Sequence, residues 1–185
     1  QPYVRLKLAI SLDGATAMQN GESKWITGEA ARNDVQKLRA SSGAILTGSG
    51  TVISDNPSLT VRDTKLKAKQ PIRVVLDTNL DTPSESFLYQ SGQKTIIFCV
   101  DDKDKKKYKN GHVSVLTTDK KGDYINLNSV LKALANEGIN EILVESGSVL
   151  SGAFLREKLV DELVIYQAPL IMGSRTMSMF STPEW

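Results

Sequence analysis

Short apolar runs alternate with segments of helical periodicity along this chain, and this alternation limits the folds that it can adopt. Strand character is present at residues 3–10, 44–47, 72–77, 95–100, 113–116, 141–145 and 162–167. Helical spacing of apolar side chains is present at residues 28–41, 127–137 and 147–158. Thr27 is the expected N-cap of the first of these helices. Alternation of this kind predicts a layered α/β domain with a mostly parallel central sheet.

Size and composition narrow the class of protein further. The 185 residues suffice for one domain with a sizeable core, and 40% hydrophobic with 24% charged residues is typical of a soluble globular protein. A net charge of +2 argues against nucleic acid as the main partner. No run approaches the roughly 20 apolar residues of a membrane helix, and no signal peptide opens the chain. We therefore expect a cytoplasmic protein with neither nucleic-acid nor membrane partners.

Metal catalysis has little support in the sequence. The single cysteine, Cys99, lies in an apolar run, which predicts a reduced core thiol. The single histidine, His112, belongs to no zinc-binding pattern and has no serine partner for a catalytic triad. We expect no metal site.

The segment LVESGSVLSG at residues 143–152 places a carboxylate, Glu145, between an apolar strand and a helix that opens at Gly147. A helix N-terminus offers unpaired N–H groups and the positive end of a dipole, so a phosphate can bind there. The alternative is a plain tight turn, with Glu145 as a solvated strand-end residue or a helix cap. The segment alone leaves both interpretations open.

Other chemically versatile residues follow predicted strands, where open α/β sheets bind ligands. Asp13 stands in a turn after the first strand, with a local hydrogen-bonding role as the alternative. The residues Gly-Ser-Gly-Thr at 48–51 follow the second strand and form a turn that can cradle a pyrophosphate. Arg39 and Arg62 can fork onto a phosphate or form surface ion pairs of little energetic value. Trp25 can cover a flat heterocycle or pack in the core.

Four segments together resemble the reductase domains of the riboflavin-biosynthesis RibD family. They read LKLAISLDG at residues 6–14, GESKWITGEAAR at 21–32, LTGSGTVISDNPSLTVR at 46–62 and LVESGSVLSGAFL at 143–155. The tail VDELVIYQAP at 160–169 and Gly173 fit the same family, in order and at similar spacing. The resemblance implies a dihydrofolate-reductase-like, three-layer α/β fold, with residues 1–185 as one reductase domain.

The resemblance also implies a reaction and a set of site residues. The reaction is the NADPH-dependent reduction of 5-amino-6-(5-phosphoribosylamino)uracil to its ribitylamino product, in which the ribose ring opens and C1′ receives a hydride. Substrate contacts are implied for Ser23, Arg39, Leu59, Arg62 and Glu145. NADPH contacts are implied for Ala9, Trp25, Thr51, Asp55, Thr78, Gly147, Ser148, Val149, Leu150, Ser151, Gly152 and Ala153.

Catalytic roles are expected for three residues, Lys7, Asp13 and Glu145. Lys7 and Asp13 fall in the family's first motif, and either Lys7 or Glu145 is expected to donate the proton that ring opening requires. The family further suggests a homodimer. Its N-terminal zinc deaminase domain and its final C-terminal segment have no counterpart in these residues, so we expect neither zinc binding nor deamination.

Two other functions remain open from the sequence. Another dihydrofolate-reductase-like NADPH reductase would bind a pterin in place of the ribose phosphate, and would need fewer phosphate-directed cations than Arg39 and Arg62 provide. A non-catalytic nucleotide-binding module would keep Trp25 and the glycine turns, but would leave Lys7 and Glu145 without a chemical task.

Overall fold

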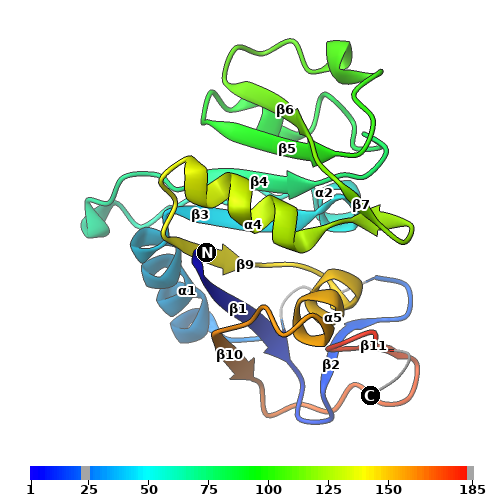
Figure 1. Cartoon of the computed structure of the whole chain (residues 1–185). Coiled ribbons are helices and arrows are strands. Elements are labelled where there is room, and N and C mark those ends of the chain that lie inside the picture. Colours follow the sequence, from blue (N-terminus) through cyan, green and yellow to red (C-terminus); the bar gives the residue numbers. More distant parts are fainter. Residues whose placement is uncertain (22–25, 183–185) are drawn as a thin grey trace.

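All seven strands of the central sheet run parallel, in the order β10-β1-β9-β3-β4-β5-β6 (Figure 1). The computed structural model describes residues 1–21 and 26–182. In sheet order the strands are β10 (Glu162–Gln167), β1 (Tyr3–Ile10), β9 (Glu141–Val144), β3 (Ala44–Gly48), β4 (Ile72–Leu76), β5 (Thr95–Cys99) and β6 (Val113–Thr117). β1, the first strand of the chain, therefore lies between β9 and β10, which come late in the sequence.

Helices cover both faces of this sheet and complete a layered α/β fold, as the alternating pattern predicts (Figure 1). One face carries α1 (Glu29–Ser41), and the opposite face carries α4 (Leu127–Asn136) and α5 (Ser148–Arg156). Two further helices are short: α2 (Ser49–Asp55) follows β3, and α3 (Phe87–Gln90) precedes β5. None of the helices in the described ranges is long and apolar enough to cross a membrane.

The buried apolar side chains form three clusters, and the alternation of side chains along the strands separates the largest, the larger core, from the other two, of which the smaller core lies against α1. Leu6 and Val144 pack with Leu131 of α4 and Phe154 of α5 in the larger core. Alternate residues point to the α1 face, where the buried residues Ile45, Leu59 and Leu143 pack together against Leu38 of α1. In β1 the buried positions are Val4, Leu6, Leu8 and Ile10, so Lys7 and Ala9 lie on the α1 face. Lys7 is therefore directed toward α1 by strand geometry alone.

Two local predictions are wrong. The N-cap of α1 is Gly28 rather than Thr27, and no side chain caps this helix. Residues 49–51 form the first turn of α2 rather than an irregular turn, with Gly48 as N-cap. The apolar side chain of Val52 is 1% exposed and packs in a buried cluster, and this burial stabilises α2.

Two short ladders have no counterpart in the sequence pattern. β2 (Ala15–Met18) pairs antiparallel with β11 (Thr176–Ser178), and β7 (Lys120–Lys121) pairs with β8 (Tyr124–Ile125). The first of these pairs joins the turn after β1 to the end of the chain. Its partners are far apart in sequence, so neither strand gives a local signal.

The C-terminal segment passes directly over α5 at Gly152. The amide of Ser181 donates to the carbonyl of Ser148 at 3.0 Å, and Phe180 packs against the larger core. A Cβ atom at Gly152 would lie 2.5 Å from the carbonyl oxygen of Ser181. Close approach of two backbones therefore requires glycine here, independently of any ligand.

We predict that Gly152→Ala lowers the free energy of unfolding by about 1–3 kcal/mol, since the Cβ atom forces Ser181 away from α5. Urea denaturation measures this loss. Gly50→Ala in α2 is the matched control, because no heavy atom lies within 4 Å of its Cβ position and alanine favours a helix. Equal stability of Gly152→Ala and the wild type would show that Ser181 does not pack on α5.

Candidate functional site

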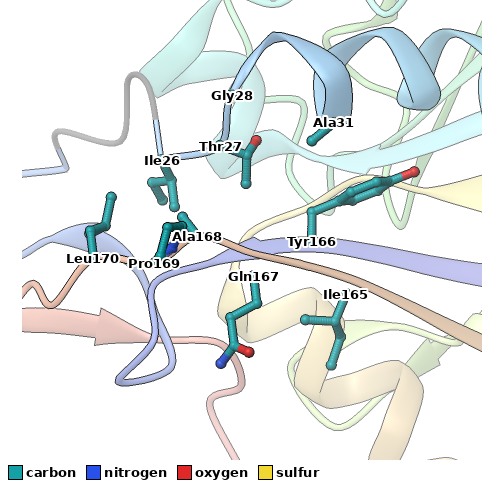
Figure 2. Close-up of a pocket in the computed structure, with 10 residues that line it drawn as sticks. All are labelled: Ile26, Thr27, Gly28, Ala31, Ile165, Tyr166, Gln167, Ala168, Pro169 and Leu170. Atoms are coloured by element: carbon teal, nitrogen blue, oxygen red, sulfur yellow. The ribbon is translucent and has the colours of Figure 1, made fainter.

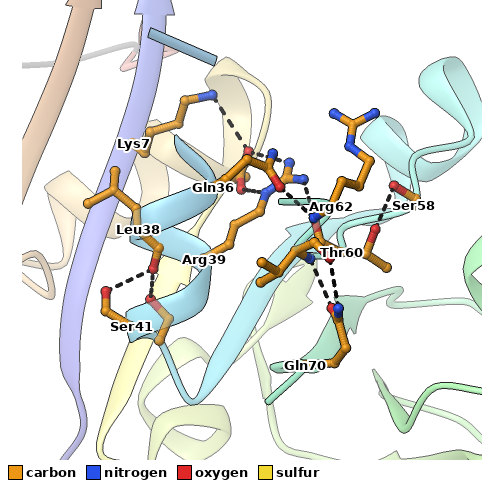
Figure 3. Close-up of polar contacts among 12 residues, drawn as sticks. Lys7, Gln36, Leu38, Arg39, Ser41, Ser58, Thr60, Arg62 and Gln70 are labelled. Carbon is orange, nitrogen blue, oxygen red and sulfur yellow. Dashed lines mark hydrogen bonds and ion pairs between the residues drawn. The ribbon is translucent and has the colours of Figure 1, made fainter. Parts of the chain in front are cut away.

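Lys7, Arg39 and Glu145 form a charge cluster on the α1 face of the sheet (Figure 3). Nε and Nη2 of Arg39 donate to the two carboxylate oxygens of Glu145, at 2.6 and 3.1 Å. Nζ of Lys7 lies 3.6 Å from Oε2 of the same carboxylate. The three residues come from β1, the last turn of α1 and the position after β9. The fold thus brings together three predicted site residues that are distant in sequence.

The cluster is largely shielded from solvent, and this determines its charge state. The side chains of Arg39 and Glu145 are each 11% exposed. Burial by itself would raise the pKa of Glu145, but the charges of Arg39 and Lys7 outweigh burial and lower the pKa below its usual value. Glu145 is therefore a carboxylate at neutral pH, with both oxygens held by Arg39. In this state it accepts hydrogen bonds and has no proton to donate.

A loop after α2 lies against the cluster. Its Thr60 carbonyl accepts from Nη1 of Arg39 at 3.0 Å, and the amide of Arg62 donates to the side chain of Gln36 on α1 at 2.7 Å. Leu59 has a left-handed backbone, with φ of 47°, and its side chain is buried in the smaller core. Any substrate contact of Leu59 is therefore made by its backbone.

Arg62 is the exposed cation of this loop. Its guanidinium makes no hydrogen bond or ion pair within the described residues, and Figure 3 shows it extended without a dashed contact. Arg39, in contrast, is fully engaged by Glu145 and Thr60. Arg62 is thus the cation of the site that is ready to bind an anion.

Residues assigned to the cofactor lie at the carboxyl ends of the strands. Thr51 and Asp55 are in α2 after β3, Thr78 follows β4, and residues 147–153 follow β9. Both α2 and α5 begin after a glycine N-cap without a side-chain cap, so their first N–H groups are open to a ligand. A Cβ atom at Gly48 would lie 3.3 Å from the side chain of Leu150, so these two helix starts are adjacent.

Not every residue of the 147–153 segment is free for a ligand. The hydroxyl of Ser151 is fully buried, lies 3.0 Å from the hydroxyl of Ser146, and also donates to the carbonyl of Ser146. Gly152 is covered by Ser181. The amides of Ser148 and Val149, at the start of α5, are the better placed donors.

The carboxylate of Asp13 is held by hydrogen bonds from three other residues. Its carboxylate accepts from the hydroxyl of Ser11 at 2.5 Å, from the amide of Met172 at 3.1 and 3.2 Å, and from the amide of Gly173 at 2.8 Å. These hydrogen bonds, led by that of Ser11, lower the pKa of Asp13 to about 2. The contacts favour the hydrogen-bonding alternative over a catalytic role, because the carboxylate ties the turn after β1 to the C-terminal segment.

The sequence model of the RibD C-terminal domain matches residues 2–184. The chain therefore belongs to the RibD C-terminal domain family. Riboflavin biosynthesis protein RibD of Escherichia coli strain K12 is 41% identical over 194 residues, which cover 98% of this chain and 52% of that protein. The chain spans about half the length of the RibD proteins that it matches. A protein of Buchnera aphidicola named 5-amino-6-(5-phosphoribosylamino)uracil reductase is 40% identical, with 84% of this chain and 80% of that protein covered.

Solved structures agree with this family membership. The structure of Acinetobacter baumannii RibD, form 2, matches with a TM-score of 0.86 and 37% identity, over 100% of this chain and 50% of that one. The riboflavin biosynthesis reductase Rib7 of Saccharomyces cerevisiae matches with a TM-score of 0.79 at 23% identity, which concerns the fold alone. The predicted dihydrofolate-reductase-like fold, shared by this RibD family domain, is confirmed.

Some site residues of this RibD family domain lie outside what the sequence predicted or what the structure describes. Ser23 and Trp25 fall outside the described residues, so their predicted contacts stay predictions. Gln36 and the carbonyl of Thr60, which hold Arg62 and Arg39, were not foreseen. Gln36 precedes Arg39 by three residues on α1, and this spacing on one helix face is the signal that points to it.

We predict that Glu145→Gln removes a pH-dependent part of the stability. The folded pKa of Glu145 lies below its unfolded value of about 4.3, so the stabilisation is present above that value and is lost as the pH falls through the folded pKa. In urea titrations the wild type should exceed the variant by a constant unfolding free energy above about pH 5, and by a shrinking amount at lower pH.

Glu137→Gln is the control for this titration, because the Glu137–Lys94 pair is exposed and contributes little. A stability difference between the wild type and Glu145→Gln that stays the same at every pH would contradict the ion pair described above.

Proposed function

We propose that this chain reduces 5-amino-6-(5-phosphoribosylamino)uracil to 5-amino-6-(5-phosphoribitylamino)uracil with NADPH, in riboflavin biosynthesis. The observation that carries this proposal is the charge cluster of Lys7, Arg39 and Glu145, with the unpaired cation of Arg62 beside it. The named reductase from Buchnera aphidicola, which this chain matches over most of its length, supports the same activity.

The charges of the site suit a phosphorylated sugar. Lys7, Arg39 and Arg62 provide three cations against the single carboxylate of Glu145, so the site has an excess of positive charge. Arg62 is free to fork onto a phosphate, and Arg39 is oriented next to it by Glu145 and the Thr60 carbonyl. A pterin has no phosphate that would use these cations, so the arrangement favours the sugar phosphate over dihydrofolate.

The starts of α2 and α5 suit the pyrophosphate of a dinucleotide. Their amides are uncapped and adjacent, and no atom lies within 4 Å of a Cβ position at Gly147, which leaves the approach open. We assign Ala9, Thr51, Asp55 and Thr78 to the remaining cofactor contacts at the same edge of the sheet. When bound, NADPH supplies the hydride for C1′ of the sugar.

Lys7 is the proton donor in this proposal. As C1′ accepts the hydride, its bond to the ring oxygen breaks and the oxygen takes a proton from Nζ of Lys7. Glu145 keeps the ammonium group in place through the 3.6 Å ion pair. Apart from this proton, hydride transfer requires mainly that the protein positions the two reactants. A homodimer in the cytoplasm, as expected from the family, stays part of the proposal.

Competing substrates test the reaction directly. NADPH oxidation, followed by absorbance, should proceed with the ribosylaminouracil phosphate and not with dihydrofolate. The same assay with NADH tests the cofactor preference. Turnover of dihydrofolate alone would replace this proposal with another reductase of the same fold, and turnover of neither would leave a nucleotide-binding module.

Two substitutions should separate proton donation from substrate binding. Lys7→Met should lower kcat by about 10²–10⁴-fold, the usual contribution of a positioned acid, with little change in the affinity for NADPH. Arg62→Ala should raise KM for the substrate with a smaller effect on kcat. Lys37→Met is the matched control, since Lys37 lies on α1 with a side chain 68% exposed. An unchanged kcat in Lys7→Met would exclude Lys7 as the donor.

A further inference from the structure

Arg73 is a buried cation without a counter-charge. It lies on β4, where Val74 and Leu76 pack in the larger core, so its side chain points to the opposite face of the sheet. The residue is 0% exposed, and no carboxylate of the described residues pairs with it. Burial lowers the pKa of Arg73 to about 10, so the guanidinium is still charged at neutral pH. Such a charge is unusual, because desolvation of an unpaired ion is costly.

The hydrogen bonds of Arg73 all go to uncharged acceptors. Nη1 donates to Oγ of Ser91 at 2.6 Å and to the carbonyl of Ser58 at 3.5 Å, and Nη2 donates to the carbonyl of Gln93 at 2.6 Å. Nε is buried and has no partner within the described residues. Compensation of this charge therefore requires an anion that the described part of the chain does not supply.

A cavity of about 670 Å³ is lined by all three residues that accept from Arg73. We call it the α3 cavity, and its principal lining residues are Ser58, Arg62, Phe87, Ser91, Gly92 and Gln93. Ser58 and Arg62 come from the loop after α2 (Figure 3), and Arg62 adds an exposed guanidinium. No acidic residue lines the cavity, so its electrostatic potential favours an anion.

A second cavity provides a contrast. It measures about 380 Å³ and lies between the start of α1 and the end of β10, as Figure 2 shows with Thr27 and Ala31 facing the strand of Tyr166. None of its ten lining residues carries a charge. A preference for an anion is therefore a property of the α3 cavity and not of hollows in this fold generally.

The segment after α3 offers hydrogen-bond donors to such an anion. Ser91 has φ of −82° and ψ of 4°, and Gly92 has φ of 75°. Successive right-handed and left-handed residues form a nest, a backbone concavity whose N–H groups bind anions. The amides of Gly92 and Gln93 donate to no acceptor within the described residues. The hydroxyl of Ser91 accepts from Arg73, which leaves its proton free for an anion.

Phe87 gives the cavity an aromatic surface beside these donors. It is 52% exposed, and its amide donates to the side chain of Asn56 at 2.7 Å, which fixes the start of α3 to the end of α2. A flat ring attached to the anion can stack on this side chain. The volume of the cavity also falls in the range that holds a small organic ligand.

We infer that the α3 cavity binds a phosphate monoester of an aromatic compound. The phosphate accepts from the hydroxyl of Ser91 and from the two open amides after it, with the guanidinium of Arg73 behind them, and the aromatic group lies on Phe87. No member of the charge cluster lines this cavity, and Arg62 borders both sites. The site is thus separate from the one proposed for the reductase reaction, and its ligand binds without NADPH or substrate.

Inorganic phosphate and phenyl phosphate test the anion site by calorimetry at constant ionic strength. Ser91→Asp places a carboxylate beside Arg73, which takes the place of the anion and should weaken both probes by about tenfold or more. Ser114→Asp is the matched control, since it adds the same charge at an exposed serine of β6. Equal binding of phosphate to these two variants would overturn the inference.

A second pair of variants tests the aromatic part of the ligand. Phe87→Ala should weaken phenyl phosphate by about threefold to tenfold and leave inorganic phosphate unchanged. Tyr124→Ala is the control, because Tyr124 is an aromatic residue of β8 that is 65% exposed and does not line the cavity. Unchanged affinity of Phe87→Ala for phenyl phosphate would overturn the assignment of the aromatic group to Phe87.

Amide chemical shifts of the wild type give a measurement that does not depend on any variant folding. Added inorganic phosphate should shift the amides of Gly92 and Gln93. Shifts confined to Lys7, Arg39 and Glu145 would overturn the inference, by giving the phosphate to the charge cluster. Shifts of Gly92 and Gln93 without turnover of the ribosylaminouracil phosphate would support the anion site and refute the proposed reaction alone.

Discussion

The ion pair between Arg39 and Glu145 is the interaction on which the arrangement of this site depends. It joins α1 to the end of β9 across the smaller core, and Arg39 extends the connection to the loop at Thr60. Each side chain is 11% exposed, so removing one partner leaves a nearly buried charge without compensation. The pair holds three segments in one geometry, and its cost in desolvation is offset by two direct hydrogen bonds.

The residues around this pair lie on two sides of the sheet. On the α1 face the pair contacts Lys7 and the loop that carries Arg62. Two residues after Glu145 the chain turns into α5, which packs on the opposite face with Phe154 in the larger core. In the proposed function, groups for a substrate and groups for a cofactor are only two residues apart in sequence and would face different ligands. The strand-to-helix junction would then bring the two reactants together.

Much of the architecture follows from the sequence, because strands of a parallel sheet are buried on both faces and appear as continuous apolar runs. The runs at 72–77, 95–100 and 162–167 agree with β4, β5 and β10 to within a residue. β2 and β11 are short and pair across the length of the chain, so no local pattern marks them. The N-cap of α1 is Gly28 rather than Thr27, and no side chain caps the helix, so the preference of threonine for this position does not decide where α1 begins.

The sequence predicts which residues form the candidate site better than it predicts what each residue does there. Lys7, Arg39 and Glu145 are each recognisable from motifs, but the sequence does not show that Arg39 and Glu145 bind each other across 106 positions. That pairing engages Arg39 and leaves the guanidinium of Arg62 without a partner in the described part of the chain, while the choice of proton donor between Lys7 and Glu145 stays a prediction. The sequence likewise does not show the role of Asp13, because its partners Met172 and Gly173 lie near the other end of the chain.

The position of β1 between β9 and β10 has a consequence for the order in which the molecule assembles. The first ten residues gain their two ladder partners only after residues 141–167 have been synthesised. Until then the apolar side chains of β1 have no neighbouring strand to cover them, and contacts of such large sequence separation form slowly. The charge cluster is completed in the same late step, because Lys7 and Glu145 belong to β1 and the end of β9. A nascent chain that ends before this point has neither a paired β1 nor a complete charge cluster.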